Sequence, residues 1–166
     1  MNRTSSVSGI ASVAIGLSTA AWGAPAPGTS AWTPSAQEEA LLQQLSLRDG
    51  SPACAEMEVG LSDPRASWKA VVDHVSMPPW APMRAADCLI SGHSAASRAD
   101  LVGWVTRPEL KGLGLLALGR LDVMPQDVAT EVASAAITRG PDPAGARVRV
   151  ARSANPAIAE LAAVKE

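Results

Sequence analysis

The sequence predicts an all-α protein, on three observations. Prolines that suit helix starts recur at nearly equal spacing, the apolar residues between them step by three and four positions, and no pair of segments alternates like a β-hairpin. The composition agrees, because alanine and leucine are abundant and five tryptophans are the only aromatic residues in the 166-residue chain. We expect about nine short helices joined by short turns.

Pairs of a capping residue and a proline mark the expected helix starts. At Asp63-Pro64, for example, the carboxylate can accept a first-turn N–H, and proline fits a position whose N–H would lack a partner. The other expected starts are Ser51-Pro52, Asp142-Pro143, Asn155-Pro156, Pro79, Pro108, Pro125 and a capping box of Ser35 with Glu38. We expect Gly92 and Gly140 in left-handed conformation at helix ends.

Apolar stripes identify the faces expected to be buried. One stripe consists of Trp68, Val71, Val72 and Val75, and a second of Leu101, Val102 and Val105. The segment 110–121 is apolar on nearly all sides, which predicts a helix covered by its neighbours.

The helix starts repeat with a constant period. Pro34, Pro64, a start near Ala95, Pro125 and Pro156 are separated by 30, 31, 30 and 31 residues, and each interval holds a second start. Local echoes support this alignment: "VTRP" at 105–108 returns as "ITRGP" at 137–141. A period of about 30 residues with two helices is typical of stacked helical hairpins, which bury their apolar stripes against one another.

The segment "PMRAADCLISG" (82–92) resembles the second helix of a HEAT-type repeat of the short bacterial kind, in which an arginine precedes small residues and a leucine. The resemblance implies that residues 35–166 form a right-handed α-solenoid of about four hairpins with a C-terminal closing helix. It also implies a surface that binds other proteins, with no catalytic residues to transfer. A generic helical bundle is the alternative fold.

The N-terminal region indicates export. Arg3 is the only charged residue before Glu38, Val7 to Ala21 is mostly apolar, and Ala21-Trp22-Gly23 fits signal cleavage before Ala24. That stretch is shorter than the roughly 20 apolar residues of a membrane span. We therefore expect a signal peptide at 1–23, a flexible linker at 24–34, a periplasmic or secreted mature chain, and no membrane span in it.

Cys54 and Cys88 are the only cysteines, an even count that favours a disulfide in an exported chain. One detail opposes it, because Cys54 lies two residues after Pro52 and Cys88 nine after Pro79. Helices with aligned starts would separate the two cysteines by about 10 Å along the axis, and a disulfide needs Cα atoms within about 7 Å. The sequence therefore leaves two alternatives, a disulfide between Cys54 and Cys88 or two buried free thiols.

No catalytic, metal or cofactor site is predicted. His74 follows Asp73, and His93 lies near Cys88 in the sequence, but neither histidine has the spacing of a metal site or a visible partner for nucleophilic catalysis. The segment "KGLGLLALG" (111–119) has no preceding strand and no Lys-Ser/Thr, so it does not predict a phosphate-binding loop. We expect its glycines to let two helices pack closely.

Charge is distributed unevenly. Residues 24–63 carry six acidic residues against Arg48 alone, whereas residues 139–152 carry four arginines against Asp142. The net charge of −2 argues against nucleic-acid binding. The opposite ends could dock a partner or another copy weakly, or could simply be solvated. The candidate protein-binding residues are Arg139, Arg147, Arg149, Arg152, Trp80 and Trp104, although each tryptophan could instead belong to the core.

The sequence therefore predicts a non-catalytic, exported scaffold for an unknown protein partner, with the second helices of the repeats as the binding surface. Two alternatives remain. One is an enzyme or enzyme-accessory subunit with a groove site around His74 and Asp73 or around His93. The other is a structural element of a cell-envelope assembly, tethered by the linker.

Overall fold

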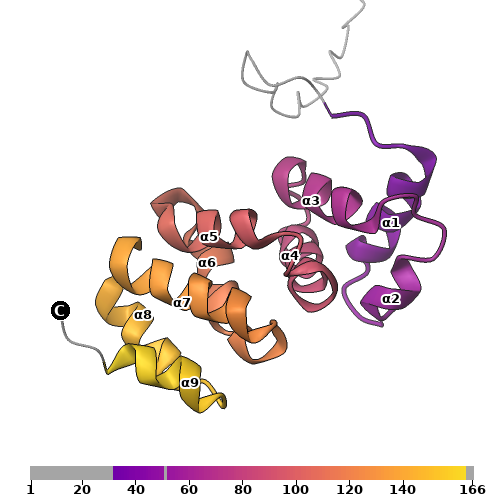
Figure 1. Cartoon of the computed structure of the whole chain (residues 1–166). Coiled ribbons are helices and arrows are strands. Elements are labelled where there is room, and N and C mark those ends of the chain that lie inside the picture. The colour runs from indigo at the N-terminus through magenta and orange to yellow at the C-terminus, as the bar shows by residue number, and fades with distance from the viewer. Residues whose placement is uncertain (1–31, 51, 164–166) are drawn as a thin grey trace, which may run out of the picture. The chain divides into compact units, whose positions relative to one another are not determined.

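A computed structural model describes residues 32–50 and 52–163, and these residues form helices and turns without a strand (Figure 1). None of the helices in these ranges is both long and apolar enough to cross a bilayer. The predicted signal peptide and most of the predicted linker lie outside the described residues. The elements are α1 (Ala36–Ser46), α2 (Cys54–Met57), α3 (Pro64–His74), α4 (Trp80–His93), α5 (Arg98–Thr106), η1 (Pro108–Leu110), α6 (Lys111–Leu118), η2 (Leu121–Val123), α7 (Gln126–Arg139), α8 (Pro143–Val150), α9 (Pro156–Ala159) and η3 (Glu160–Ala162).

The caps explain most of the helix starts. Ser35 and Glu38 form the expected capping box at α1, and Asp63 accepts the N–H of Ala66 ahead of Pro64. Asp142 and Asn155 cap α8 and α9 in the same way. Each cap satisfies an N–H that has no partner within its helix.

Several expected boundaries are wrong. The second start is not at Pro52, since α2 begins at Cys54, and α5 begins at Arg98 rather than near Ala95. Gly92 lies inside α4, and Gly140 ends α7 with a φ of −71°, so neither glycine is left-handed. The glycines with positive φ lie instead in the turns on either side of α2, at Gly50 and Gly60.

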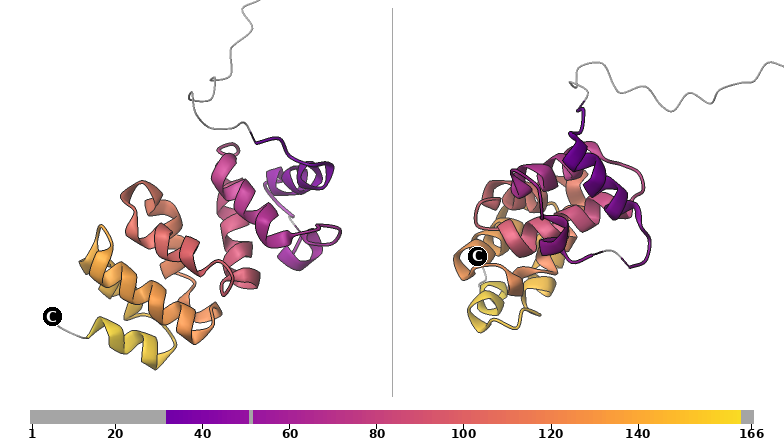
Figure 2. Two further views of the ribbon diagram at one scale, coloured as in Figure 1. Left: turned by 45° about the horizontal axis from the view of Figure 1, so that its top comes forward. Right: turned by 90° about the vertical axis from the view of Figure 1, so that its right-hand side faces the viewer.

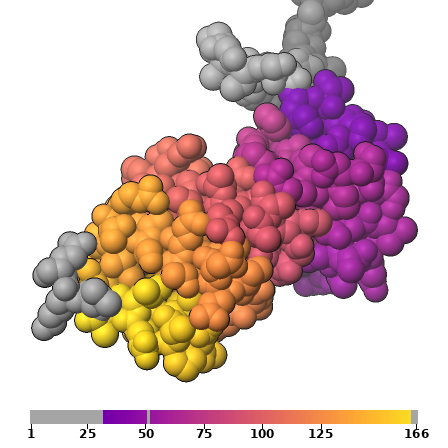
Figure 3. Space-filling view, in the orientation of Figure 1, coloured from indigo at the N-terminus to yellow at the C-terminus, as the bar shows by residue number. Residues whose placement is uncertain are grey.

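Taken two at a time in chain order, the helical elements form successive pairs, and each pair contacts its neighbours in the chain. The pairs are α1/α2, α3/α4, α5/α6, α7/α8 and α9/η3. Every extensive contact between these helices joins elements of the same pair or of adjacent pairs. Within the described body, the colours accordingly succeed one another in chain order in the left-hand view of Figure 2 and in Figure 3.

The core follows the predicted stripes. Trp68 and Val71 of α3 are fully buried, and Leu101 and Val105 of α5 are almost fully buried, whereas the flanking Val72, Val75 and Val102 are partly buried against them. Burying a large apolar side chain contributes about 1.5–3 kcal/mol. The small residues of α4 and α7 keep these helices close to their neighbours; those buried are Ala81, Ala85, Ala86, Ala129, Ala133, Ala135 and Ala136.

Polar contacts also join adjacent pairs. Arg84 of α4 donates to the carbonyls of Leu47 and Arg48 (2.7 Å for the latter), which lie just beyond the end of α1. Arg65 of α3 pairs with Asp100 of α5 at 3.1 Å. Further ion pairs between adjacent pairs are Arg98 with Asp127 and Glu131, and Arg120 with Asp87.

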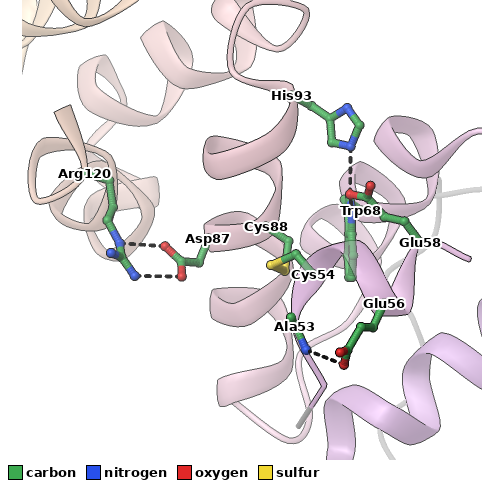
Figure 4. The surroundings of a disulfide bond; sticks show 9 residues. All are labelled: Ala53, Cys54, Glu56, Glu58, Trp68, Asp87, Cys88, His93 and Arg120. Atoms are coloured by element: carbon green, nitrogen blue, oxygen red, sulfur yellow. Dashed lines mark hydrogen bonds and ion pairs between the residues drawn. A yellow bond between two sulfur atoms is a disulfide. The ribbon is translucent and has the colours of Figure 1, made fainter. Parts of the chain in front are cut away.

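A disulfide joins Cys54 of α2 to Cys88 of α4. The offset that opposed it does not arise, because α2 is a single turn that begins at Cys54 and packs beside the second half of α4, with a Cα–Cα distance of 5.4 Å. Two buried free thiols are therefore excluded in this structure. The disulfide thus links α2 covalently to α4 of the next pair (Figure 4).

Glu58, one residue beyond α2, makes a second connection in the same place. Its Oε1 accepts the indole N–H of Trp68 at 2.8 Å and lies 2.9 Å from Nε2 of His93 (Figure 4). Burial by itself would raise the pKa of Glu58, but the hydrogen bonds from Trp68 and His93 and the charge of His93 together lower it below the ordinary value of 4.5. The ionised form is therefore favoured in the folded protein.

We expect acid to remove this contribution. A carboxylate whose folded-state pKa is lowered stabilises the fold fully above its unfolded pKa near 4.5, and the contribution is lost as the pH falls through the folded pKa. Glu58→Gln should cost about 1 kcal/mol at pH 7, because a charged acceptor strengthens both hydrogen bonds. The difference should shrink as urea unfolding is repeated from pH 5 to pH 3.

The matched control is Glu109→Gln, since Glu109 is exposed and its side chain makes no hydrogen bond or ion pair within the described residues. Its pH profile should follow that of the wild type. A gap between Glu58→Gln and wild type that stays constant down to pH 3 would contradict the assigned role of the Glu58 carboxylate.

Candidate interaction groove

A pocket of about 160 Å³ opens between the third and fourth helix pairs. It collects the end of α5, the start of α6, the end of α7 and the first turns of α8. Its lining residues are Trp104, Val105, Arg107, Pro108, Lys111, Gly114, Leu115, Leu118, Ala136, Gly140, Pro141, Asp142, Gly145, Ala146 and Arg149.

Two glycines allow the backbones to meet at the base of this pocket. A Cβ on Gly114 of α6 would lie 2.7 Å from the carbonyl oxygen of Trp104 in α5. A Cβ on Gly140 would lie 2.9 Å from the carbonyl oxygen of Val105. Both distances are shorter than any that real Cβ atoms tolerate, so the close packing predicted for the 111–119 glycines holds at Gly114. Gly112 faces open space and has no such role.

The walls of the pocket are largely apolar. Trp104 is only 5% exposed and forms part of the lining with Val105, whereas Leu115 is 38% exposed. The expectation that 110–121 is covered on nearly all sides is therefore wrong at Leu115. The neighbouring pairs cover α6 along Gly114 and Ala117, and the opposite side, including Leu115, is left open.

Three cations surround this apolar lining without a carboxylate partner in the described part of the chain: Arg107, Lys111 and Arg149. By contrast, Arg65 and Lys69 pair with Asp100, and Arg98 and Arg120 pair with carboxylates of neighbouring elements. The three cations come from two different pairs, so folding brings them to the same pocket. Their positive charges can therefore interact with a group that enters the pocket.

Asp142, the carboxylate in the lining of this pocket, already binds the backbone. Asp142 Oδ1 accepts the N–H of Gly145 at 2.9 Å and caps α8. The lining therefore carries an excess of positive charge.

A second hollow of about 190 Å³ continues this pocket along α6 and α8. It shares Leu118 and Arg149 with the first and adds Arg152, together with Asp122. Asp122 accepts hydrogen bonds from the hydroxyl of Ser153 and the N–H of Ala154, and the Ser153 bond foremost lowers its pKa. We call the two hollows together the α6–α8 groove. Its lining has four cations and two carboxylates.

The binding residues predicted from the sequence do not all lie in one place. Trp104, Arg149 and Arg152 line the α6–α8 groove. Arg139 is exposed at the end of α7, one residue before the lining residue Gly140, and Arg147 of α8 is partly buried. Trp80 is 37% exposed at the start of α4 and does not line the groove.

The two histidines lie in separate surroundings. His93 meets Glu58, whereas the ring of His74 stacks on that of Trp32, with centroids 5.4 Å apart. Beside His74, Asp73 is bound to Lys69 at 2.7 Å. His74 also lines a hollow of about 330 Å³ with Leu42 and Met77. Among the described residues, no group of three or more potential metal ligands was found.

Sequence reasoning missed Arg107, Lys111 and Leu115 as groove residues. Arg107 and Lys111 flank the turn of the third pair, and the arginine cluster lies in the fourth, so only the stacking of pairs unites them. One signal was present in the sequence: Arg107 precedes Pro108 at the turn position where Arg139 precedes Gly140-Pro141.

Comparisons with protein-family models, with curated proteins and with solved structures found no match to this chain.

Proposed function

We propose that this chain is a non-catalytic protein-interaction module, built as a right-handed α-solenoid of HEAT-type helical hairpins and exported from the cytoplasm. The α6–α8 groove carries the functional part of the proposal. It combines an apolar lining with cations that have no carboxylate partner in the described part of the chain. Such a surface has an interaction left to make.

The contact pattern supports the solenoid. Extensive contacts that stay within a pair or between adjacent pairs are what stacked repeats require, since each repeat contacts only its neighbours. Polar links such as Arg65–Asp100 and Arg120–Asp87 span 35 and 33 residues, close to one repeat. A bundle around one centre would instead bring the first and last pairs together.

Two features support export. The Cys54–Cys88 disulfide is of a kind that persists in oxidising compartments. The N-terminal segment has the composition of a cleaved signal peptide. Both features together support a periplasmic or extracellular location.

The small size of each hollow in the groove favours a protein partner over a substrate or cofactor. A single site for a small molecule usually encloses about 300–1,000 Å³, whereas the two hollows have about 160 and 190 Å³. An enclosed apolar cavity of about 150 Å³ accommodates one benzene-sized group. The pocket therefore fits a single side chain, which is how protein interfaces use such hollows.

Saturable capture tests the function. The mature protein, immobilised in its oxidised form, should retain specific proteins from its native envelope extract, and excess free protein should compete for them. Captured proteins should be identical in repeated preparations. Retention that free protein does not compete, or none at all, would contradict the role as an interaction module.

A further inference from the structure

We infer that the α6–α8 groove binds an acidic, extended segment of a partner protein, with one apolar side chain of that segment inserted between α6 and α8. This inference rests on the proposed function and specifies its ligand. It follows from three properties of the groove: its charge, its apolar lining and its length.

The charge selects the sign of the ligand. Arg107, Lys111 and Arg149 converge on the main pocket with no carboxylate partner among the described residues, and Arg152 extends the positive charge into the adjoining hollow. The two lining carboxylates, Asp122 and Asp142, accept backbone N–H groups. A segment bearing carboxylates complements the excess of cations.

The apolar lining favours a ligand that carries an apolar side chain between its carboxylates. Trp104, Leu115 and Leu118 form part of a pocket large enough for one leucine-sized or phenyl-sized group. Burying such a side chain contributes about 1.5–3 kcal/mol, equivalent to about ten- to a hundredfold in affinity. Charge alone, at exposed cations, gives much less.

The length of the groove selects an extended ligand over a compact one. The second hollow continues the first past the shared Leu118 and Arg149. A compact anion would occupy one hollow only. A peptide segment can place its apolar side chain in the main pocket and a carboxylate near Arg152.

The probe is a short synthetic peptide with one leucine between glutamates, titrated into the oxidised full mature chain by fluorescence anisotropy. Replacing its leucine by alanine should weaken binding about tenfold or more. Replacing its glutamates by glutamines should also weaken it, as should raising the salt from about 20 to about 500 mM. If the leucine and alanine peptides bound equally well, the inference that an apolar side chain inserts into the pocket would be wrong.

Variants locate the site. Lys111→Gln and Arg149→Gln should each weaken binding about two- to fivefold, and together about tenfold. Both side chains are exposed, so the unfolding midpoint should hardly change. Arg48→Gln removes an exposed cation that does not line the groove and should leave binding unchanged. Equal losses in all three variants would indicate diffuse charge attraction and overturn the site.

Two outcomes separate this inference from the proposed function. If the Lys111→Gln/Arg149→Gln protein still captures the same partners as wild type, the interaction module stands and the groove assignment falls. If the peptide does not bind and sedimentation shows self-association that the double variant abolishes, the groove takes a second copy of this chain. The segment to test would then be residues 56–63, which carry three acidic residues and Val59, whose side chain is 82% exposed.

Discussion

Removing the Cys54–Cys88 disulfide should lower the free energy of unfolding by about 4 kcal/mol. The two cysteines are 34 residues apart. A disulfide that closes a loop of this length lowers the conformational entropy of the unfolded chain, which stabilises the fold by about this amount. The expected observation is a lower urea midpoint for Cys54→Ser/Cys88→Ser than for the oxidised wild type. Wild type in reductant should match the double variant.

The loss should begin at α2. This helix is a single turn with one buried residue, Met57, and its contacts are mainly to α4. Without the disulfide, α2 and its flanks keep the Glu58 hydrogen bonds, the buried Met57 and the partly buried Leu61 as their contacts with the core. Hydrogen exchange should therefore rise first over residues 53–60, while α7 stays protected, as expected where repeats interact with nearest neighbours.

Two results would contradict this account. An unchanged urea midpoint after reduction would mean that the disulfide adds nothing to the fold. A uniform rise in exchange from α2 to α8 would mean that the chain unfolds as one unit rather than pair by pair. Reduction of wild type also serves as the control for the serine substitutions, because it leaves the sequence intact.

The helices could be predicted from the sequence because their signals are local. A cap such as Asp63 with Pro64 depends only on the first turn of its own helix, and the stripe from Trp68 to Val71 depends only on helical spacing. These predictions are confirmed. The expected number of helices, about nine, also agrees with the nine α-helices of the described residues.

What the sequence did not predict depends on how pairs meet. The place where α2 starts, and with it the geometry of the disulfide, depends on packing against α4. Gly140 was assigned a left-handed conformation from its position after a helix. What requires a glycine there is close approach to two carbonyl oxygens, since a Cβ would lie 2.9 Å from that of Val105 and closer still to that of Ala136. The groove is non-local in the same sense, since Lys111 and Arg149 meet only when two pairs stack.

Gly114→Ala should destabilise the protein by about 1–2 kcal/mol, the overpacking cost less the gain in helix propensity. The added Cβ would lie 2.7 Å from the Trp104 carbonyl oxygen and 3.3 Å from the Val105 Cα, and these are backbone atoms that cannot rotate away. The helix α6 must therefore move off α5. Overpacking of this kind costs about 1–3 kcal/mol, and here it outweighs the gain of about 1 kcal/mol from the better helix former. Urea unfolding measures the difference.

Gly112→Ala is the matched control, because it places the same substitution in the same helix. Its Cβ would meet nothing within 4 Å, so only the propensity gain remains and stability should rise by up to about 1 kcal/mol. The two variants should thus differ in sign. Gly114 also lines the main pocket, so its alanine variant should weaken binding of the acidic leucine peptide, whereas Gly112→Ala should not. If both variants were equally stabilising, α5 and α6 would not approach as closely as described, and the pocket built on that approach would not exist.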